Sequence, residues 1–361
     1  MISLRTGLLL LVGVLAACGA ADEATEPRGG VGPTVPARGT GTGTTTEGEQ
    51  TLAEGPMSED EGAPGEEGAG TSVAVEPDVD GSEADPEVES MPEAPVAARC
   101  DRTKPFDAPK LVAGLNTDRN ETAPRLTSDE LGIFFMRQGT SSAQIVTATR
   151  TELGGAWSAA VLVKELSSSA HDGSPSLTAD GLTMYFHSNR SPSSGSYDIW
   201  RSVRASKAAP WGTPTRLSIL SSAASDTYPY VRPDGRALYF SSLRSGHYNV
   251  YVASVDAAGK VAEPRGLGNI NTEEEEASPV PTADGLALYF MRRGTTNDIW
   301  VSRRTKTSDS WGAPRKVLEL SSTSDERPSW VSTDECLLYL TSTGRPGSVG
   351  GADLYVAQRM P

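Results

Sequence analysis

Five carboxylates in the second part of this 361-residue chain each stand three residues before a proline. Each is followed by a turn aspartate, a short apolar run and an arginine. Converging carboxylates could hold a cation or a polar ligand, whereas an acid and an arginine of one unit could form a repeated internal ion pair. All five copies carry both partners, which favours the ion pair. The acids are Glu121, Asp172, Asp226, Glu276 and Asp325, and the arginines are Arg137, Arg190, Arg244, Arg293 and Arg345.

Other residues that could carry chemistry stand outside this pattern. The run Glu273–Glu276 breaks the repetition; we expect a solvated loop there, with recruitment of a cation or a basic partner as the alternative. Trp330 has no aromatic counterpart in the other copies except Tyr230, which makes it the candidate ligand contact. The three histidines lack the spacing of zinc ligands, so we expect no metal and no cofactor. They are His171, His187 and His247.

No sequence pattern typical of a catalytic centre is present. The chain has no Gly-x-Ser-x-Gly nucleophile elbow, no Gly-Lys-Ser phosphate loop and no His-Glu-x-x-His zinc motif. We therefore expect a protein that is not an enzyme. From residue 100 onward the chain holds 28 acidic and 28 basic residues. This balance argues against nucleic acid as a partner, because nucleic-acid binding needs a basic footprint.

The acids and arginines belong to a larger unit that occurs five times. Two stretches of it, TADGLTMYF at 178–186 and TADGLALYF at 282–290, differ at only two positions. The turn aspartates of successive units are 51, 54, 50 and 50 residues apart. Near-equal spacing of this kind indicates a repeat architecture. The turn aspartates are Asp129, Asp180, Asp234, Asp284 and Asp334.

Each unit predicts four short strands. An Asp-Gly or Asp-Glu turn joins the first two as a hairpin, and the apolar run after the turn suits a strand covered on both faces. The third strand carries an Ile-Trp-like pair, and the fourth follows Trp157, Trp211 or Trp311 where these are present. Four-stranded sheets that pack on copies of themselves form a propeller. We therefore expect an all-β fold, a five-bladed β-propeller with four-stranded blades.

The repeated frame acid-x-x-Pro, Asp-Gly, Leu-Tyr-Phe-x-x-x-Arg and Asp-Ile-Trp resembles the WD40-like repeat of TolB-type β-propellers. The resemblance covers essentially all residues from Cys100 onward and implies a propeller of the bacterial cell envelope. The TolB type is similar to a six-bladed wheel, whereas the five turn aspartates here indicate five blades. Five-bladed glycosidases use carboxylates on inner strands as acid and base, and the predicted inner strands of this chain contain none.

The ring should be closed by the beginning of the domain. The fifth unit stops at its third strand, near Asp353–Val356, and the segment Phe106–Val112 matches the missing fourth strand. This N-terminal strand should join the last blade and remove the open sheet edges. Cys100 and Cys336 would then lie at the same end of that blade, so we expect a disulfide between them, with two free thiols as the alternative.

The N-terminus has the pattern of an exported, lipid-anchored protein. Residues 1–17 carry one positive charge and an apolar run too short to span a bilayer, as a signal peptide does. The sequence Leu-Ala-Ala-Cys at 15–18 resembles the bacterial lipobox and implies lipidation of Cys18. Between 19 and 99 there are 19 acidic and 3 basic residues. A segment so polar should be disordered, so we divide the chain into a signal peptide (1–17), a lipidated linker (18–99) and a propeller domain (100–361).

These observations together predict the kind of protein rather than its ligand. We expect a monomeric lipoprotein of the cell envelope, in the outer membrane, with the propeller in the periplasm or at the cell surface. The lipid would bind the membrane, and the propeller would be a non-catalytic platform for an envelope protein. The alternative is a carbohydrate-binding or carbohydrate-active propeller that uses the channel mouth.

Overall fold

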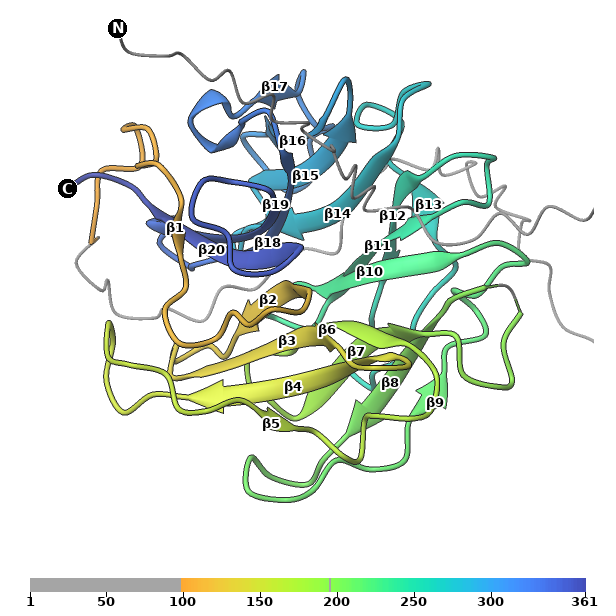
Figure 1. Ribbon diagram of the computed structural model, residues 1–361. Helices are drawn as coiled ribbons and strands as arrows, with labels where there is room; N and C mark the ends of the chain where they lie inside the picture. The colour runs from red at the N-terminus through yellow and green to blue at the C-terminus, as the bar shows by residue number, and fades with distance from the viewer. Residues whose placement is uncertain (1–98, 195) are drawn as a thin grey trace, which may run out of the picture. The chain divides into compact units, whose positions relative to one another are not determined.

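The computed structural model describes residues 99–194 and 196–361, shown as the coloured ribbon in Figure 1. The signal peptide, the lipidation site at Cys18 and residues 19–98 of the linker lie outside the described residues. Within the described part, no helix is long and apolar enough to cross a membrane.

The described residues form five four-stranded antiparallel sheets, one for each predicted unit. This confirms the five-bladed propeller. Blade one contains β2 (Glu121–Leu126), β3 (Gly132–Gln138), β4 (Ala143–Thr149) and β5 (Val161–Leu162). Blade two contains β6 (Asp172–Leu177), β7 (Thr183–Ser188), β8 (Asp198–Val203) and β9 (Thr215–Arg216). Blade three contains β10 (Asp226–Val231), β11 (Ala237–Ser242), β12 (Asn249–Ser254) and β13 (Arg265–Gly266).

The last two blades follow the same order, and the last is completed by the beginning of the domain. Blade four contains β14 (Glu276–Pro281), β15 (Ala287–Arg293), β16 (Asn297–Arg303) and β17 (Arg315–Lys316). A short 3₁₀ turn, η1 (Leu318–Leu320), leads to blade five. Blade five contains β18 (Asp325–Val331), β19 (Leu337–Thr343), β20 (Ala352–Gln358) and, as its fourth strand, β1 (Lys110–Leu111).

The ring closes as the sequence predicts. Strand β1 pairs antiparallel with β20, with Lys110 opposite Val356, and Figure 1 shows β1 beside the C-terminal strand. An isolated bridge between Phe106 and Arg359 extends this pairing. The terminal blade is therefore built from both ends of the domain, and β1 pairs the edge of β20 that would otherwise be open.

The core lies between blades and is filled by the repeated aromatic residues. Phe186, Phe240 and Phe290, at the same position of three second strands, are completely buried. The Asp-Gly turns that precede these strands place glycine at a φ near 70°, a region that residues with a Cβ avoid. Blades one and five have a glutamate there instead, Glu130 at 57° and Glu335 at 54°.

The propeller has two unlike faces. The first strands of neighbouring blades (β2, β6, β10, β14 and β18) contact one another around the centre. We call the side that carries the hairpin turns between first and second strands, together with the loops between third and fourth strands, the turn face. The opposite side carries the loops between second and third strands and the links from blade to blade, and we call it the loop face.

Candidate functional site

The acids of the repeat lie on the loop face, where each first strand begins, and they are fully buried. In blade one, Glu121 accepts hydrogen bonds from the backbone N–H of Thr117 at 2.9 Å and from its hydroxyl at 2.6 Å. Arg137 donates from Nε to the same carboxylate at 2.8 Å. Arg137 also donates to the carbonyl of Leu115 at 2.8 Å and stacks on Phe135. We call this arrangement the hydroxyl–acid–arginine unit.

The same unit occurs in every blade. A Ser or Thr four residues before the acid donates to it with both its N–H and its hydroxyl, and an arginine binds the other side. On the second strand, the residue that pairs with the acid varies with the length of the acid. It is Arg in blades one and four, where the acid is Glu, and Ser in blades two and three, where the acid is the shorter Asp. The remaining units are Ser168–Asp172–Arg190, Ser222–Asp226–Arg244, Thr272–Glu276–Arg292 and Ser322–Glu326–Arg345.

Two members of the predicted set are corrected by this geometry. In blade five the buried acid is Glu326, which lies opposite Ser342. Asp325 stays half-exposed and accepts only the backbone N–H of Asn297, at 2.8 Å. In blade four the partner of Glu276 is Arg292, at 2.8 Å, because the strand register places it directly opposite. The predicted partner, Arg293, is exposed on the neighbouring position.

The acid-x-x-Pro pattern predicts the wrong acid in blade five because the first strand of that blade has a different bulge. In blades one to four a residue with φ near 50° stands between the acid and the proline: Ala123, Ser174, Tyr228 or Ser278. Blade five has no such residue at this bulge, and its register shift falls between Pro328 and Trp330. Its acid therefore lies two residues, not three, before the proline.

All five carboxylates of the units are occupied by an arginine of their own blade and by a Ser or Thr of the segment that leads into it. Their side chains are fully buried, so they do not line an open channel mouth as the cation hypothesis required. The run Glu273–Glu276 is divided between the two kinds of contact. Glu276 belongs to a unit, whereas Glu275 forms an ion pair with Arg293 at 2.9 Å on the surface.

The histidines bind backbone groups, although His171 and His187 lie near enough to interact electrostatically. Nδ1 of His171 accepts the N–H of Ala143, and Nδ1 of His187 accepts the N–H of Tyr228 in the next blade, both at 3.3 Å. Burial lowers the pKa of His187 to about 4, against the attraction of Asp172. Within the described residues, no group of three or more His, Cys, Asp or Glu is placed to hold a metal ion.

The blades differ most at one position of the first strands, at the centre of the ring. Here the register places a different residue in each blade opposite an aromatic residue of the second strand. The guanidinium of Arg125 lies over the ring of Tyr230, two blades away, with its carbon 4.2 Å from the ring centre. The five residues are Arg125, Ser176, Tyr230, Val280 and Trp330.

A small cavity opens beside these residues on the turn face. It has a volume of about 50 Å³ and is lined by Arg125, Ser176, Tyr230 and Trp330 with the residues of the adjoining turns. Trp330, the candidate ligand contact, is half-buried and packs edge-on against Tyr339. The structure thus places it in the wall of this central cavity.

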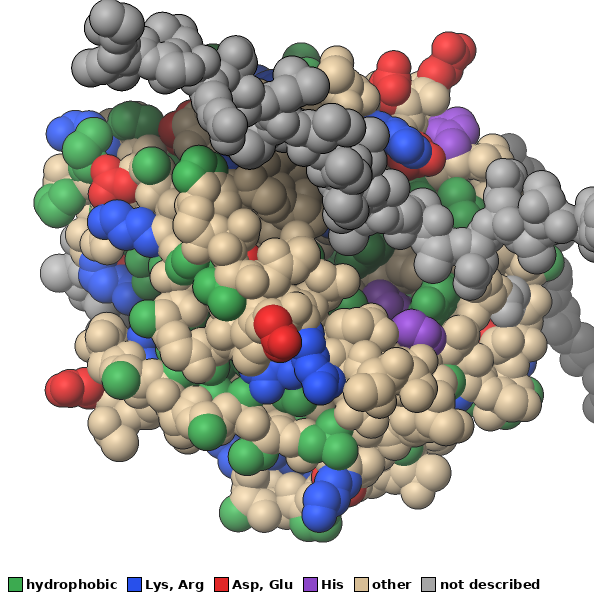
Figure 2. Space-filling model, in the orientation of Figure 1, with side chains coloured by type: hydrophobic (Ala, Val, Ile, Leu, Met, Phe, Trp, Pro, Cys, Tyr) green, Lys and Arg blue, Asp and Glu red, His purple; other side chains and the backbone are tan. Residues whose placement is uncertain are grey.

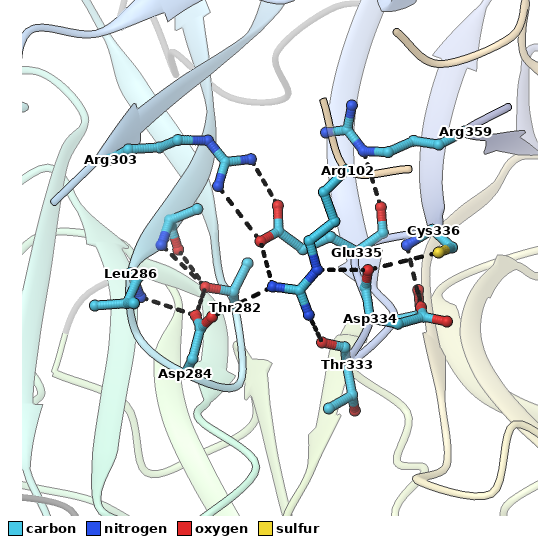
Figure 3. A network of polar contacts seen from close by, with 12 residues as sticks. Arg102, Thr282, Asp284, Leu286, Arg303, Thr333, Asp334, Glu335, Cys336 and Arg359 are labelled. Carbon is cyan, nitrogen blue, oxygen red and sulfur yellow. Dashed lines mark hydrogen bonds and ion pairs between the residues drawn. The ribbon is translucent and has the colours of Figure 1, made fainter. Parts of the chain in front are cut away.

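The turn face also carries an ion-pair network that links the last two blades (Figure 3). Glu335, in the left-handed turn position, accepts from Nη2 of Arg303 at 2.6 Å and from the hydroxyl of Tyr289 at 3.2 Å. Arg102 lies between Glu335 and Asp284, 3.7 Å from each. Backbone strain of 1–3 kcal/mol is typical of a non-glycine residue held in this region, and here the ion pairs offset it.

The joint between blades five and one has its own lock. Cys100 and Cys336 form a disulfide. Next to it, Arg99 binds Glu130 at 2.6 Å and Asp334 at 2.7 Å. Burial alone would raise the pKa of Asp334, but its hydrogen bonds, that from Arg99 first, lower it to about 2. A groove of about 630 Å³ runs along this joint, past Trp157.

Several of these residues were not singled out from the sequence. The Ser or Thr four residues before each acid is a regular signal that a search of the repeat could have found. The turn glutamates also stand out, because they replace glycine at a repeated position. The sequence gives no such signal for Arg125. Its lack of an acidic partner depends on which side chains the other four blades place around it.

The propeller is similar to solved structures of two kinds. No protein-family model matches the chain, and no curated protein matches it in sequence. TolB from Acinetobacter baumannii is 18% identical with a TM-score of 0.43 over 67% of this chain, which spans 56% of the length of that protein. A putative TolB from Agrobacterium tumefaciens is 16% identical, with a TM-score of 0.43 over 72% of this chain and 91% of that one.

The second kind is enzymatic. A thermostable family-43 glycoside hydrolase is 12% identical, with a TM-score of 0.48 over 69% of this chain and 92% of the hydrolase. Likenesses at these identities concern the fold alone and do not choose between a binding protein and an enzyme. The strand topology shows a five-bladed β-propeller, and TolB proteins are among its structural neighbours.

Proposed function

We propose that this protein is a lipid-anchored component of the bacterial cell envelope whose propeller binds another protein through its turn face without catalysis. The observation that carries the proposal is the contrast between the faces. The carboxylates that repeat in every blade lie on the loop face and are all paired there, whereas four residues that differ from blade to blade around the ring axis, Arg125, Ser176, Tyr230 and Trp330, line a cavity on the turn face. Function normally breaks the symmetry of a repeat fold, so the turn face is the one suited to a specific partner.

Cavities support the same face. Hollows of about 50, 390 and 630 Å³ each include residues of hairpin turns or of third-to-fourth-strand loops in their lining, together with residues of the adjoining strands. On the side drawn in Figure 2, basic and acidic side chains lie interspersed among uncharged atoms, often next to one another, without a large patch of either sign. A neutral surface with local pockets is suited to a protein partner and unsuited to nucleic acid.

The central cavity gives little support to glycoside hydrolysis, the main catalytic alternative. That reaction needs two carboxyl groups on opposite sides of the bond that is cleaved. The residues that line the cavity include a cation and two aromatic rings but no carboxylate. The second candidate function is sugar binding against Trp330, because aromatic side chains also stack on sugar rings. The experiment below distinguishes it from protein binding.

Affinity capture with face-specific variants tests the proposal. The mature lipoprotein is captured from native envelopes as wild type, as the turn-face variant Lys207→Glu/Arg236→Glu, and as the loop-face variant Arg119→Glu/Arg293→Glu. All four side chains are exposed, and the charge change is the same in both variants. We expect the turn-face variant to lose a protein that the wild type and the loop-face variant retain.

The opposite pattern, or glycan turnover by the purified wild type, would contradict the proposal. The anchor is tested separately. Cys18→Ser should abolish incorporation of labelled palmitate and release the protein from the membrane fraction, because one acyl chain or more provides the membrane affinity. Retention of the variant in membranes at the wild-type level would remove the lipoprotein part of the proposal and leave the binding part intact.

A further inference from the structure

Arg125 differs from the other arginines that lie deep in the described structure. Its side chain is 3% exposed, and its Nε and Nη1 atoms are buried without a hydrogen-bond partner. Arg359, which is equally buried, donates to the carbonyls of Glu335 and Lys104 and to the hydroxyl of Tyr289. Arg125 has only the face of Tyr230, which covers the plane of the guanidinium and leaves its N–H edges open.

An unpartnered buried cation is costly, because neither water nor a counter-ion stabilises its charge. Burial lowers the pKa of Arg125 to about 10, and the nearby Tyr230 hydroxyl opposes this shift. The group therefore remains protonated at neutral pH. Its position in the lining of the turn-face cavity provides a use for the charge, since a ligand group that fills the cavity lies beside the guanidinium.

The size and charge of the cavity restrict what that ligand is. Pockets that enclose a whole small molecule have volumes of about 300 Å³ or more, whereas this cavity has about 50 Å³. A water needs roughly 10–15 Å³ in this measure, so the space suits one small polar group at the end of a larger ligand. One arginine neutralises one negative charge. A doubly charged phosphate would keep an unpaired charge in a buried place.

We propose that the central cavity on the turn face binds a single carboxylate group, which accepts hydrogen bonds from Arg125 between the aromatic walls of Tyr230 and Trp330. A guanidinium and a carboxylate match in geometry, as two parallel N–H donors face two oxygens. The inference deepens the proposed function and rests on it for the origin of the carboxylate. A C-terminus or an Asp or Glu side chain of the partner would supply the group.

Binding of propionate to the full mature chain tests the site without the partner. Saturation-transfer NMR should show saturable binding to the wild type and to Arg236→Met, whose arginine is exposed on the same face. Arg125→Met should bind at least tenfold more weakly, because the only cation of the cavity lining is gone, and Arg125→Lys should recover part of the loss. Inorganic phosphate should compete at least tenfold less well than propionate.

Equal binding by wild type and Arg125→Met, no saturation with propionate, or equal competition by phosphate would each overturn the carboxylate site. Peptides then identify the source. Acetyl-Gly-Gly with a free C-terminus and acetyl-Glu-Gly-amide carry the two kinds of carboxylate, and acetyl-Gly-Gly-amide is the control that should not bind. Propionate binding together with an unchanged capture pattern for the turn-face variant would retain this site and remove the partner hypothesis.

Discussion

The five paired arginines of the loop face and Arg125 on the turn face are used in opposite ways. On the loop face, five arginines each bind a buried acid of their own blade and a carbonyl of the segment that leads into that blade. On the turn face, Arg125 is buried with no acid at all, while Arg99, Arg102 and Arg303 join different parts of the chain. The repeated contacts hold each blade to the segment that connects it with the preceding blade. The unrepeated arginines hold the ring closed or line a cavity.

The difference indicates how a repeat fold separates stability from recognition. A contact that recurs in five blades stabilises all of them equally and cannot distinguish one partner from another. Residues that differ between blades are free to specify a ligand, because the repeated units already hold the blades together. Substitutions that affect one face and spare the other provide direct tests of this separation.

The largest effect is expected for the disulfide on the turn face. The replacement of Cys100 and Cys336 by serine should lower the free energy of unfolding by up to about 5 kcal/mol, since the bond closes a loop of more than 200 residues in the unfolded chain. The two cysteines are 236 residues apart. The measurement is the midpoint of chemical denaturation without a reducing agent.

Each single cysteine variant should be about as unstable as the double variant, because either change breaks the same bond. A double variant that unfolds at the wild-type denaturant concentration would show that the turn-face ion pairs alone keep the ring closed.

The next largest effect should come from the loop face and uses two adjacent acids. Glu326→Ala should cost about 4 kcal/mol, because the partly buried Arg345 loses its carboxylate partner. Asp325→Ala should cost about 1 kcal/mol, the value of one hydrogen bond. Arg345 lies 3.0 Å from Glu326, whereas Asp325 receives one backbone N–H.

Denaturation curves of the two variants provide the comparison, each serving as the control for the other. Equal losses for both would mean that the burial of Glu326 contributes nothing to its energetic role and would return Asp325 to the repeated set.

The repeat made the fold predictable but limited the prediction of the site. Equal spacing and the repeated apolar runs were enough for five blades, and the missing fourth strand of the last unit was enough to predict closure. These features depend on residues close in sequence. The identity of Glu326 depended on a one-residue change of register in β18, which the proline pattern concealed.

The central cavity was harder to predict for another reason. Arg125 and Tyr230 are two blades apart, and their contact depends on how far each first strand reaches toward the axis. A sequence frame aligns the blades with one another but does not show which side chains meet across the ring. Trp330 was found because it is an unusual residue type, whereas arginine occurs throughout the repeat.

A pH-dependent effect of about 3 kcal/mol is expected from the loop face. Burial lowers the folded-state pKa of His187 to about 4, below the ordinary value near 6.5. The unfolded chain therefore binds a proton first as the pH falls, and stability is lost between about pH 6.5 and pH 4. The thermal midpoint across this range should decrease more in the wild type than in His187→Ser.

Serine is the matched replacement because Ser241 accepts a backbone N–H of the next blade, from Ser278 at 3.0 Å, in the same way. Other acidic groups titrate in both proteins, so the difference between the two curves isolates the histidine. Parallel curves would contradict a neutral, blade-linking role for His187, whose surroundings also include Asp172, His171, Tyr197 and Tyr228.

The smallest effect has the most informative sign. Arg125→Met should raise the free energy of unfolding by about 1 kcal/mol in the absence of ligand, because removal of an unpaired buried charge outweighs the loss of its contact with Tyr230. The same change on the loop face, Arg137→Met, should lower it by about 3 kcal/mol, since Glu121 would lose its cation. Denaturation of both variants is the measurement. A similar loss of stability in both variants would show that Arg125 is a structural residue like the five paired arginines of the loop face. Changes of opposite sign would mean that the chain keeps this charge at a cost to its own stability, as expected for a group that binds a ligand.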